Sequence, residues 1–259
     1  MSSGVKEYGR KAGIHLIVRS MSAAIDQIVE RLRSALTERL VSVVLYGSAA
    51  GGDLQPGYSD TNVLCVLTEI TPRELAAVAP VFRWWRELGN PAPLLLTRQE
   101  FQTSTDCFTI EFRDIREQHR ILYGEDVIAG LTIDDTFYRA QVKRELRAKL
   151  LRLRHKAAGV LSDRQLLCRL MADSLSTFCV LFRHGLLLYG VDTPTGKREI
   201  IGKAAEHFKI DAAPFERLLE MRQGKAAGRE ADLGKLLAEY MQQISVVIEA
   251  VDCLKQERL

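Results

Sequence analysis

Strand-like patterns occur only in the first half of this 259-residue chain. Up to about residue 132, apolar runs typical of buried strands alternate with helical periodicities. Beyond that residue only helical periodicities remain, and such a change indicates two folding units of different kinds. We therefore predict a unit that contains a sheet over residues 21–132, and an all-helical unit over residues 133–259.

The strands of the first unit are predicted from their apolar and β-branched composition. The clearest are 41–46, which stops at a glycine, and 63–67, which is apolar throughout. Further strands are predicted over 93–97, over 109–115, where side-chain type alternates, and briefly over 120–123. One helix is predicted before the first strand, over 23–39. Two more are predicted between strands, from a cap at Thr71 to about Leu88 and, briefly, from near Arg98.

The second unit is predicted to consist of helices alone. Asp163, Thr195 and Asp211 are suitable caps for three of them. The stretch 175–188 is apolar around most of its circumference, which is typical of a central helix. The predicted helices cover 137–160, 163–189, 195–208 and 212–254, the last with an interruption near 224–228.

Composition excludes several classes of protein. The net charge of +3 is too small to indicate a nucleic-acid binder by itself, and 47% hydrophobic residues argue against extensive disorder. The five cysteines are widely spaced without a Cys-x-x-Cys pair, so neither a zinc site nor a disulfide framework is predicted. No apolar run reaches bilayer length and no secretory signal is apparent, so we expect a cytoplasmic protein without a membrane partner. The oligomeric state stays open, a homo-oligomer included.

Residues 1–20 show no clear periodicity, and Met21 directly precedes a well-formed helical pattern. We interpret the first twenty residues as a loose N-terminal arm or as the product of a start codon assigned too early.

The motif that carries chemistry joins the first two strands. Gly47 and Ser48 end the first strand, and after eleven residues Asp60 and Asn62 open the second. Backbone N–H groups in a turn of small residues can approach phosphates closely, and the Ser48 hydroxyl can donate a further hydrogen bond. Asp60 and Asn62 alternate along the strand, so their side chains project to the same face.

This spacing between two apolar strands resembles the signature of the nucleotidyltransferase-fold family, the DNA polymerase beta-like superfamily. The layout with helices behind the sheet is similar to that of aminoglycoside nucleotidyltransferases and minimal bacterial nucleotidyltransferase proteins with a C-terminal helical domain. The resemblance implies an α+β fold with a mixed sheet, flanking helices and a following helical bundle. It also implies a nucleoside triphosphate substrate, Mg²⁺ or Mn²⁺ as cofactor, and transfer of a nucleoside monophosphate to a hydroxyl acceptor on a small molecule, RNA or protein.

Carboxylates hold the metal ions in this family, and the resemblance assigns that role to Asp60, to residue 62 and to a third acid from a later strand. Glu111 is our candidate, because its apolar neighbours would point into the core and leave it on the polar face of the predicted strand. Asp114 would lie on the opposite face. We therefore predict Asp60 and Glu111 as catalytic, and Gly47 and Ser48 as phosphate-binding.

Position 62 departs from the family pattern, which has an acid there. The carbonyl of Asn62 can bind Mg²⁺ as a neutral ligand, but the site loses one negative charge. Three outcomes stay open: one well-held metal, nucleotide binding without turnover, or compensation by another acid such as Glu69 or Asp53.

A basic helix and two further cations are the candidates in the second unit. Residues 139–156 contain eight lysines and arginines and a single acid, Glu145. This helix face either attracts a triphosphate or a nucleic acid, or is an ordinary solvated surface. Lys197 and Arg198 begin a helix and are predicted to contact the nucleotide. Arg183 and His184, in the central helix, are either buried polar groups or reach a cleft.

Three functions follow in order of preference. The first is a metal-dependent nucleotidyltransferase. The second is a nucleotide- or protein-binding module that keeps the fold and has lost turnover, as Asn62 suggests. The third is a nucleic-acid-binding protein that uses the basic helix, in which reversing the charges of Arg147 and Arg152 would weaken binding.

Overall fold

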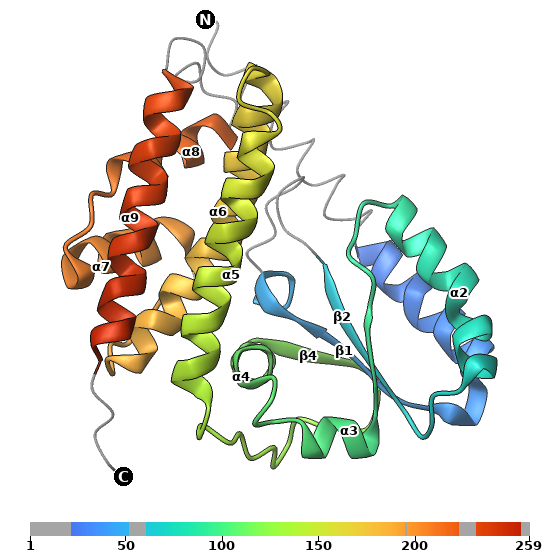
Figure 1. Ribbon diagram of the computed structural model, residues 1–259. Coiled ribbons are helices and arrows are strands. Elements are labelled where there is room, and N and C mark those ends of the chain that lie inside the picture. Colours follow the sequence, from blue (N-terminus) through green and yellow to red (C-terminus); the bar gives the residue numbers. More distant parts are fainter. Residues whose placement is uncertain (1–21, 52–60, 195, 223–231, 255–259) are drawn as a thin grey trace, which may run out of the picture. The chain divides into compact units, whose positions relative to one another are not determined.

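The computed structural model describes residues 22–51, 61–194, 196–222 and 232–254 (Figure 1). Contacts divide the chain into two compact units, with the division between Asp134 and Asp135. Each unit is described by itself below.

The first unit is built on a four-stranded sheet with the order β3-β2-β1-β4. Its strands are β1 (Leu40–Tyr46), β2 (Asn62–Leu67), β3 (Leu94–Thr97) and β4 (His119–Gly124). The central β1 pairs antiparallel with both β2 and β4, whereas β3 runs parallel to β2. The predicted mixed sheet is therefore confirmed.

Helices cover both faces of this sheet, because alternate strand residues point to opposite sides. Val43 and Leu45 belong to a core shared with the first helix, over residues 22–36, and with α2 (Pro72–Glu87). Val44 belongs to a second core shared with α3 (Arg98–Thr103) and α4 (Thr109–Glu117). A short 3₁₀ turn, η1 (Thr37–Arg39), links the first helix to β1.

Two of the helices begin with the same side-chain arrangement. Thr71 accepts a hydrogen bond from the first turn of α2 while Glu74 accepts one from the Thr71 backbone N–H, as predicted for a cap at Thr71. Thr97 and Glu100 repeat this capping box at α3. Each box satisfies backbone donors that the helix itself leaves free, which fixes where the chain turns from strand or loop into helix.

The prediction of a strand over 109–115 is wrong, because this segment forms α4. The helix is buried on more than one side. Phe112 and Ile115 lie in the second core, whereas Ile110 is buried outside it. Burial on two sides places apolar residues two positions apart in a helix, which reproduces the alternation expected of a strand. The fourth strand is instead β4, where only a brief strand was predicted.

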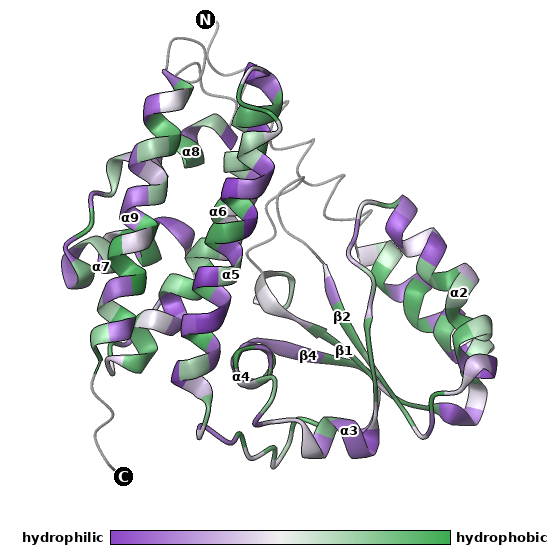
Figure 2. Ribbon diagram, in the orientation of Figure 1, coloured by the Kyte–Doolittle hydropathy of each residue, from purple (hydrophilic) through white to green (hydrophobic). Residues whose placement is uncertain are grey.

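The second unit is helical throughout its described residues and has an apolar interior (Figure 2). The long α6 contacts the other four helices and is the central element, as predicted for its apolar stretch. By length and composition alone α6 could span a membrane, but these contacts are those of the core helix of a bundle. The helices are α5 (Tyr138–Ala158), α6 (Arg164–Leu188), α7 (Lys197–Phe208), α8 (Ala213–Arg222) and α9 (Leu233–Cys253).

The predicted helices of this unit are confirmed, and so is the cap at Asp163, which accepts hydrogen bonds from Gln165 and Leu166. The predicted cap at Thr195 and the interruption near 224–228 lie outside the described residues. With a mixed sheet, flanking helices and a separate helical bundle, the predicted α+β fold class is confirmed.

Candidate functional site

The first strand ends in a tight turn whose conformation requires glycine. Gly47 begins the 3₁₀ turn η2 (Gly47–Ala49) with φ of +75°. Its carbonyl accepts a hydrogen bond from Ala50 N–H at 2.8 Å, and its own N–H donates to the carbonyl of Gln118 at 3.0 Å. A Cβ at this position would lie 3.2 Å from Nδ2 of Asn62. The turn is thus fixed between the junction of α4 with β4 and the first residue of β2.

The structure brings two predicted residues together at this edge of the sheet. Asn62 opens β2, pairs with Tyr46 and lies against Gly47. Ser48 is the middle residue of the turn, and its role as a phosphate donor stays a prediction. Asp60, predicted as a catalytic metal ligand, lies outside the described residues.

Two carboxylates of α4 affect the pKa of Tyr46, which pairs with Asn62. Burial, together with the charges of Glu111 and Asp114, raises the pKa of Tyr46 to about 12. Glu111 is exposed and lies in the first turn of α4, not on a strand. The sequence prediction placed Asp114 on the opposite face, but residues three apart in a helix lie on the same side. Both acids therefore belong to the surroundings of Tyr46, and Asp114 is an addition that only the helical spacing would have indicated.

A histidine that the sequence analysis did not select completes this edge. His119 opens β4 and pairs with Tyr46 across the sheet. Directly paired residues point to the same face, so Tyr46 lies between His119 and Asn62. The Nδ1 atom of His119 lies 3.2 Å from the carbonyl oxygen of Arg116. A carbonyl can only accept, so Nδ1 carries a proton in this contact and Nε2 is left to interact with other groups.

The described residues include oxygen donors but no complete group of metal ligands. Among them, no group of three or more His, Cys, Asp or Glu side chains is placed to hold a metal ion. Oxygen donors of the kind that Mg²⁺ prefers are present, namely the Asn62 amide and the carboxylates of Glu111 and Asp114. The chemistry of these donors fits Mg²⁺. The acid that was predicted to join them from β2 is Asp60, which lies outside the described residues.

In the helical unit, two cations approach the same part of α6. The buried thiol of Cys179 has its pKa raised to about 12 by burial, and the charges of Lys197 and Arg222 partly oppose this rise. Arg222 also donates a hydrogen bond to the Ser176 hydroxyl at 2.5 Å. Lys197 is half-buried at the start of α7, whereas Arg198 is exposed. Arg222 was not predicted, and nothing in the sequence near it indicated this position.

Arg183 and His184 are buried polar groups of the core. His184 is fully buried, and its Nδ1 lies 2.7 Å from the hydroxyl of Tyr138 at the start of α5. The two rings also meet edge to face. These contacts join α5 to α6, which is a structural role.

Comparisons with known proteins identify a solved structure with a similar fold. The crystal structure of spectinomycin adenyltransferase AAD(9) from Enterococcus faecialis with ATP and spectinomycin matches with a TM-score of 0.58 and 16% sequence identity. The match covers 89% of this chain and 99% of that chain. A toxin–antitoxin structure with AMP-PNP matches 39% of this chain and 74% of its own at a TM-score of 0.28, which is too low to support an argument. No protein-family model and no curated protein matches the chain.

Proposed function

We propose, starting from the nucleotidyltransferase fold that this chain has, that the protein binds a nucleoside triphosphate and transfers its nucleoside monophosphate to a hydroxyl group. The observation that carries this proposal is the turn after β1, in which Gly47 adopts φ of +75° against Asn62. A turn of small residues at a strand end exposes backbone N–H groups to a phosphate at close range. Transfer of this kind depends mainly on positioning and charge, which such a turn supplies.

Each residue of the site has a distinct part in this proposal. Gly47 and Ser48 bind phosphate oxygens through the backbone and the serine hydroxyl. Asp60, Asn62 and Glu111 would hold Mg²⁺ or Mn²⁺, which when bound neutralises the triphosphate and its leaving pyrophosphate. A carboxylate, Asp60 or Glu111, accepts the proton of the attacking hydroxyl.

The helical unit is proposed to add cations for the triphosphate. Lys197 and Arg198 were selected from the sequence, and the approach of Arg222 to the same part of α6 supports a contact with an anion there. A helix N-terminus adds a partial positive charge to these side chains. For the acceptor, a small molecule is the first class to test, because the structurally similar adenyltransferase was crystallised with ATP and spectinomycin.

A second candidate function is a module that binds nucleotide without turning it over. One observation favours it, the neutral side chain at position 62. A site with one carboxylate fewer holds divalent cations less tightly.

The test is release of pyrophosphate from each of the four nucleoside triphosphates with Mg²⁺ or Mn²⁺ and a panel of hydroxyl acceptors. Asp60→Ala is expected to abolish release, and Glu111→Gln to reduce it at least 10-fold, whereas the matched Glu117→Gln on the same helix leaves it within about 2-fold. If the wild type binds ATP but releases no pyrophosphate, the enzyme proposal is wrong and the binding module stands. Asn62→Asp then distinguishes a degenerate site, which gains activity, from one adapted to asparagine, which does not.

A further inference from the structure

The positive charge of the helical unit is concentrated in one helix. Residues 135–259 contain 22 lysines and arginines and 16 acids, whereas residues 1–134 contain 14 and 17. Helix α5 alone holds eight of the cations and one acid, Glu145. The net charge of +7 on α5 therefore exceeds the net charge of +6 on the whole unit, and the rest of the unit is close to neutral.

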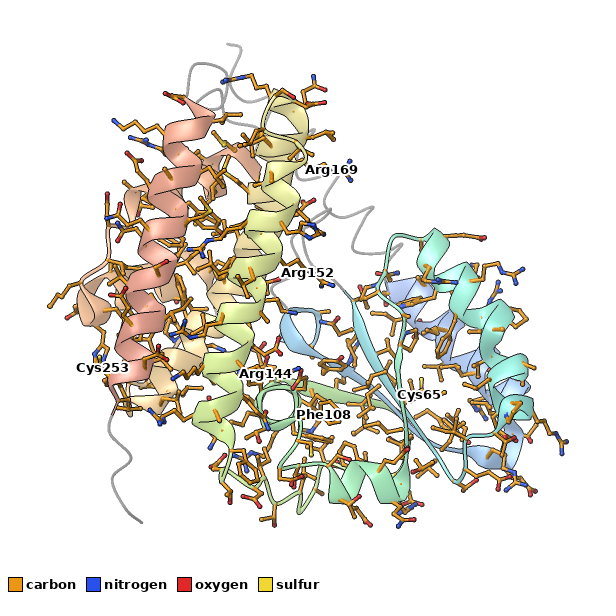
Figure 3. The ribbon with its side chains drawn as sticks, in the orientation of Figure 1. Cys65, Phe108, Arg144, Arg152, Arg169 and Cys253 are labelled. Atoms are coloured by element: carbon orange, nitrogen blue, oxygen red, sulfur yellow. The ribbon has the colours of Figure 1, made fainter. Side chains whose placement is uncertain are left out.

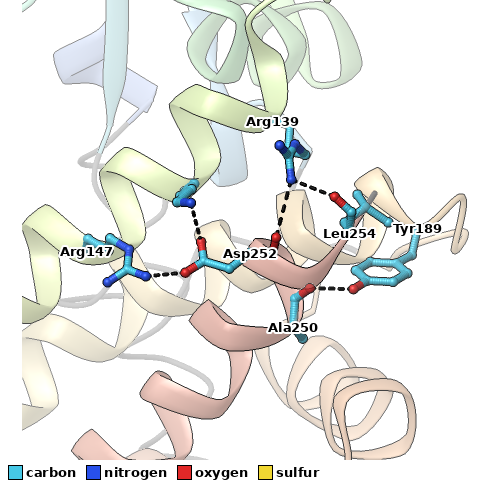
Figure 4. Close-up of polar contacts among 7 residues, drawn as sticks. Arg139, Arg147, Tyr189, Ala250, Asp252 and Leu254 are labelled. Atoms are coloured by element: carbon cyan, nitrogen blue, oxygen red, sulfur yellow. Dashed lines mark hydrogen bonds and ion pairs between the residues drawn. The ribbon is translucent and has the colours of Figure 1, made fainter. Parts of the chain in front are cut away.

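The first part of α5 has this charge compensated by neighbouring groups. Asp252 at the end of α9 forms ion pairs with Lys143, at 3.0 Å, and with Arg147 (Figure 4). Arg139 donates a hydrogen bond to the carbonyl of Leu254 at 2.6 Å, beyond the last turn of α9. Five cations of α5 thus have an acid or a carbonyl as partner, because Glu145 also pairs with Arg144 and Lys149.

The last part of α5 is different. Arg152, Arg154 and Lys156 are exposed, and none of them forms an ion pair with any residue that the structure describes. On α6, Arg169 is 80% exposed and pairs at 3.6 Å with Asp173, which is itself mostly exposed, so this pair is weak. Arg152 and Arg169 extend from these neighbouring helices, away from the interior of the bundle (Figure 3). Arg152 and Lys156, four residues apart, lie on the same side of α5, whereas Arg154 lies on the other side of buried Leu153. With Arg169 on the adjacent α6 they make three exposed cations, and the two on α5 have no ion-pair partner among the described residues.

Capping of the helix does not account for these charges. A cation stabilises the C-terminal end of a helix only within the last turn. Helix α5 ends at Ala158, so Lys156 lies in the last turn whereas Arg152 and Arg154 precede it. The arginines are therefore available for another partner, and the guanidinium fork binds phosphate oxygens through two parallel hydrogen bonds.

We propose that Arg152, Lys156 and Arg169 bind the phosphodiester backbone of a nucleic-acid strand. At a rise of about 1.5 Å per residue, Arg152 and Lys156 are roughly 6 Å apart along α5, so the cations are spread along the helix and not gathered around one phosphate. No Phe, Tyr or Trp occurs between residues 144 and 170, so this segment offers none of these three rings for bases to stack on. Binding is consequently independent of base sequence and strongly dependent on salt.

An anionic membrane fits this surface less well. Helices that lie on membranes insert a free apolar face among the lipids. The apolar face of α5 is instead buried in the bundle, through residues that include Val142, Leu146, Leu150 and Leu153. The three exposed leucines near these cations in the sequence, Leu151, Leu161 and Leu166, do not replace such a face.

The test is fluorescence anisotropy of labelled 20-nucleotide single-stranded RNA and DNA of the same sequence, with full-length protein and no nucleoside triphosphate. The triple variant Arg152→Gln/Lys156→Gln/Arg169→Gln is expected to bind at least 10-fold more weakly, and its plot of log affinity against log salt to be shallower by about 2. The control Lys143→Gln/Arg144→Gln/Arg147→Gln removes the same amount of charge at positions paired with Asp252 or Glu145, and is expected to change affinity by less than about 3-fold. If the strand is recognised through its phosphates alone, the affinities for RNA and DNA agree within a few-fold. Clearly tighter binding of RNA would show that the 2′-hydroxyls are recognised as well.

The proposal is overturned if neither strand binds, if binding does not weaken with salt, or if both triple variants lose affinity equally. It is also overturned if phosphatidylserine vesicles bind while both strands do not. Circular dichroism of both variants excludes unfolding as a cause. ATP binding is measured separately on the same samples, so failure here leaves the proposed nucleotidyl transfer unaffected, and the reverse also holds.

Discussion

The two units of this protein place their polar groups by different means. In the sheet unit, strand ends far apart in the chain meet at one edge, where Tyr46, Asn62 and His119 lie side by side around Gly47. In the helical unit, one continuous helix carries the cations, and α9 supplies an acid to some of them. The first arrangement depends on backbone conformation and close approach, the second on individual charge pairs at the surface.

This difference predicts different sensitivities to substitution. A single added carbon in the sheet unit meets backbone that cannot move, whereas a lost charge in the helical unit removes an interaction worth a fraction of the total stability. The following substitutions test the contrast, in order of decreasing effect.

Gly124→Ala is expected to have the largest effect on stability. Gly124 ends β4 with φ of +80°, and a Cβ there would overlap the carbonyl oxygen of Val41 on the neighbouring strand. The left-handed conformation alone costs roughly 1–2 kcal/mol, and the overlap should bring the loss to about 3 kcal/mol or more. Urea unfolding measures it. Gly130→Ala, at φ of +78° with nothing within 4 Å, is the control and should lose only the conformational part.

Gly47→Ala is expected to act on the site more than on the fold. Its φ of +75° carries a similar conformational cost, roughly 1–2 kcal/mol, but the neighbour of the added Cβ is the Asn62 amide, a side chain that can shift. Unfolding free energy should therefore fall as much as in Gly89→Ala, where φ is +86° and nothing lies within 4 Å. ATP affinity, measured by calorimetry, should fall about 10-fold in Gly47→Ala and stay unchanged in Gly89→Ala. Equal affinities in the two variants would contradict the proposed phosphate-binding turn.

Asp252→Asn is expected to cost about 0.5–1 kcal/mol at neutral pH. Desolvation raises the pKa of Asp252, but hydrogen bonds from Lys143 and Arg147 outweigh it and lower the pKa overall. Because the folded-state pKa lies below that of the unfolded chain, about 4, the contribution is complete above that pH and is lost as the pH falls through the folded-state value. Thermal unfolding from pH 7 to pH 2.5 should show wild type and variant converging at acidic pH. A constant difference would mean that the charge of Asp252 is irrelevant.

Arg144→Gln is expected to have the smallest effect, below about 0.5 kcal/mol, in the same unfolding assay. Arg144 is 81% exposed and pairs with its neighbour Glu145 at 3.4 Å. A loss above 1 kcal/mol would show that α5 depends on its surface charges more than this comparison allows.

Much of the architecture could be predicted from local patterns. The β-branched run of β1 and the apolar run of β2 identified the central strands, and the Thr71-Pro72 start of α2 fixed a helix boundary, because caps and buried strands depend on few neighbouring residues. The long helices of the second unit followed from their periodicity, because a helix that buries one face repeats its apolar residues every three or four positions.

The site was less predictable, because its neighbours are set by packing. Glu111 was placed on a strand since Ile110 and Phe112 alternate, whereas two-sided burial makes this segment α4. His119 was not selected as a site residue from the sequence, because only the pairing of β4 with β1 brings it beside Tyr46. The compensation of Lys143 and Arg147 likewise depends on Asp252, more than 100 residues further on.

The distribution of thiols makes this protein suited to spectroscopy. Cys65 and Cys179 are fully buried, and burial raises the pKa of each to about 12, so both resist maleimide reagents in the folded state. Cys107 in the sheet unit and Cys253 in the helical unit are exposed. Asp106 raises the pKa of Cys107, which slows its labelling at neutral pH. With the half-buried Cys168 replaced by serine, a donor and an acceptor dye can occupy one native cysteine in each unit, and energy transfer then follows any movement between the units when ATP is added.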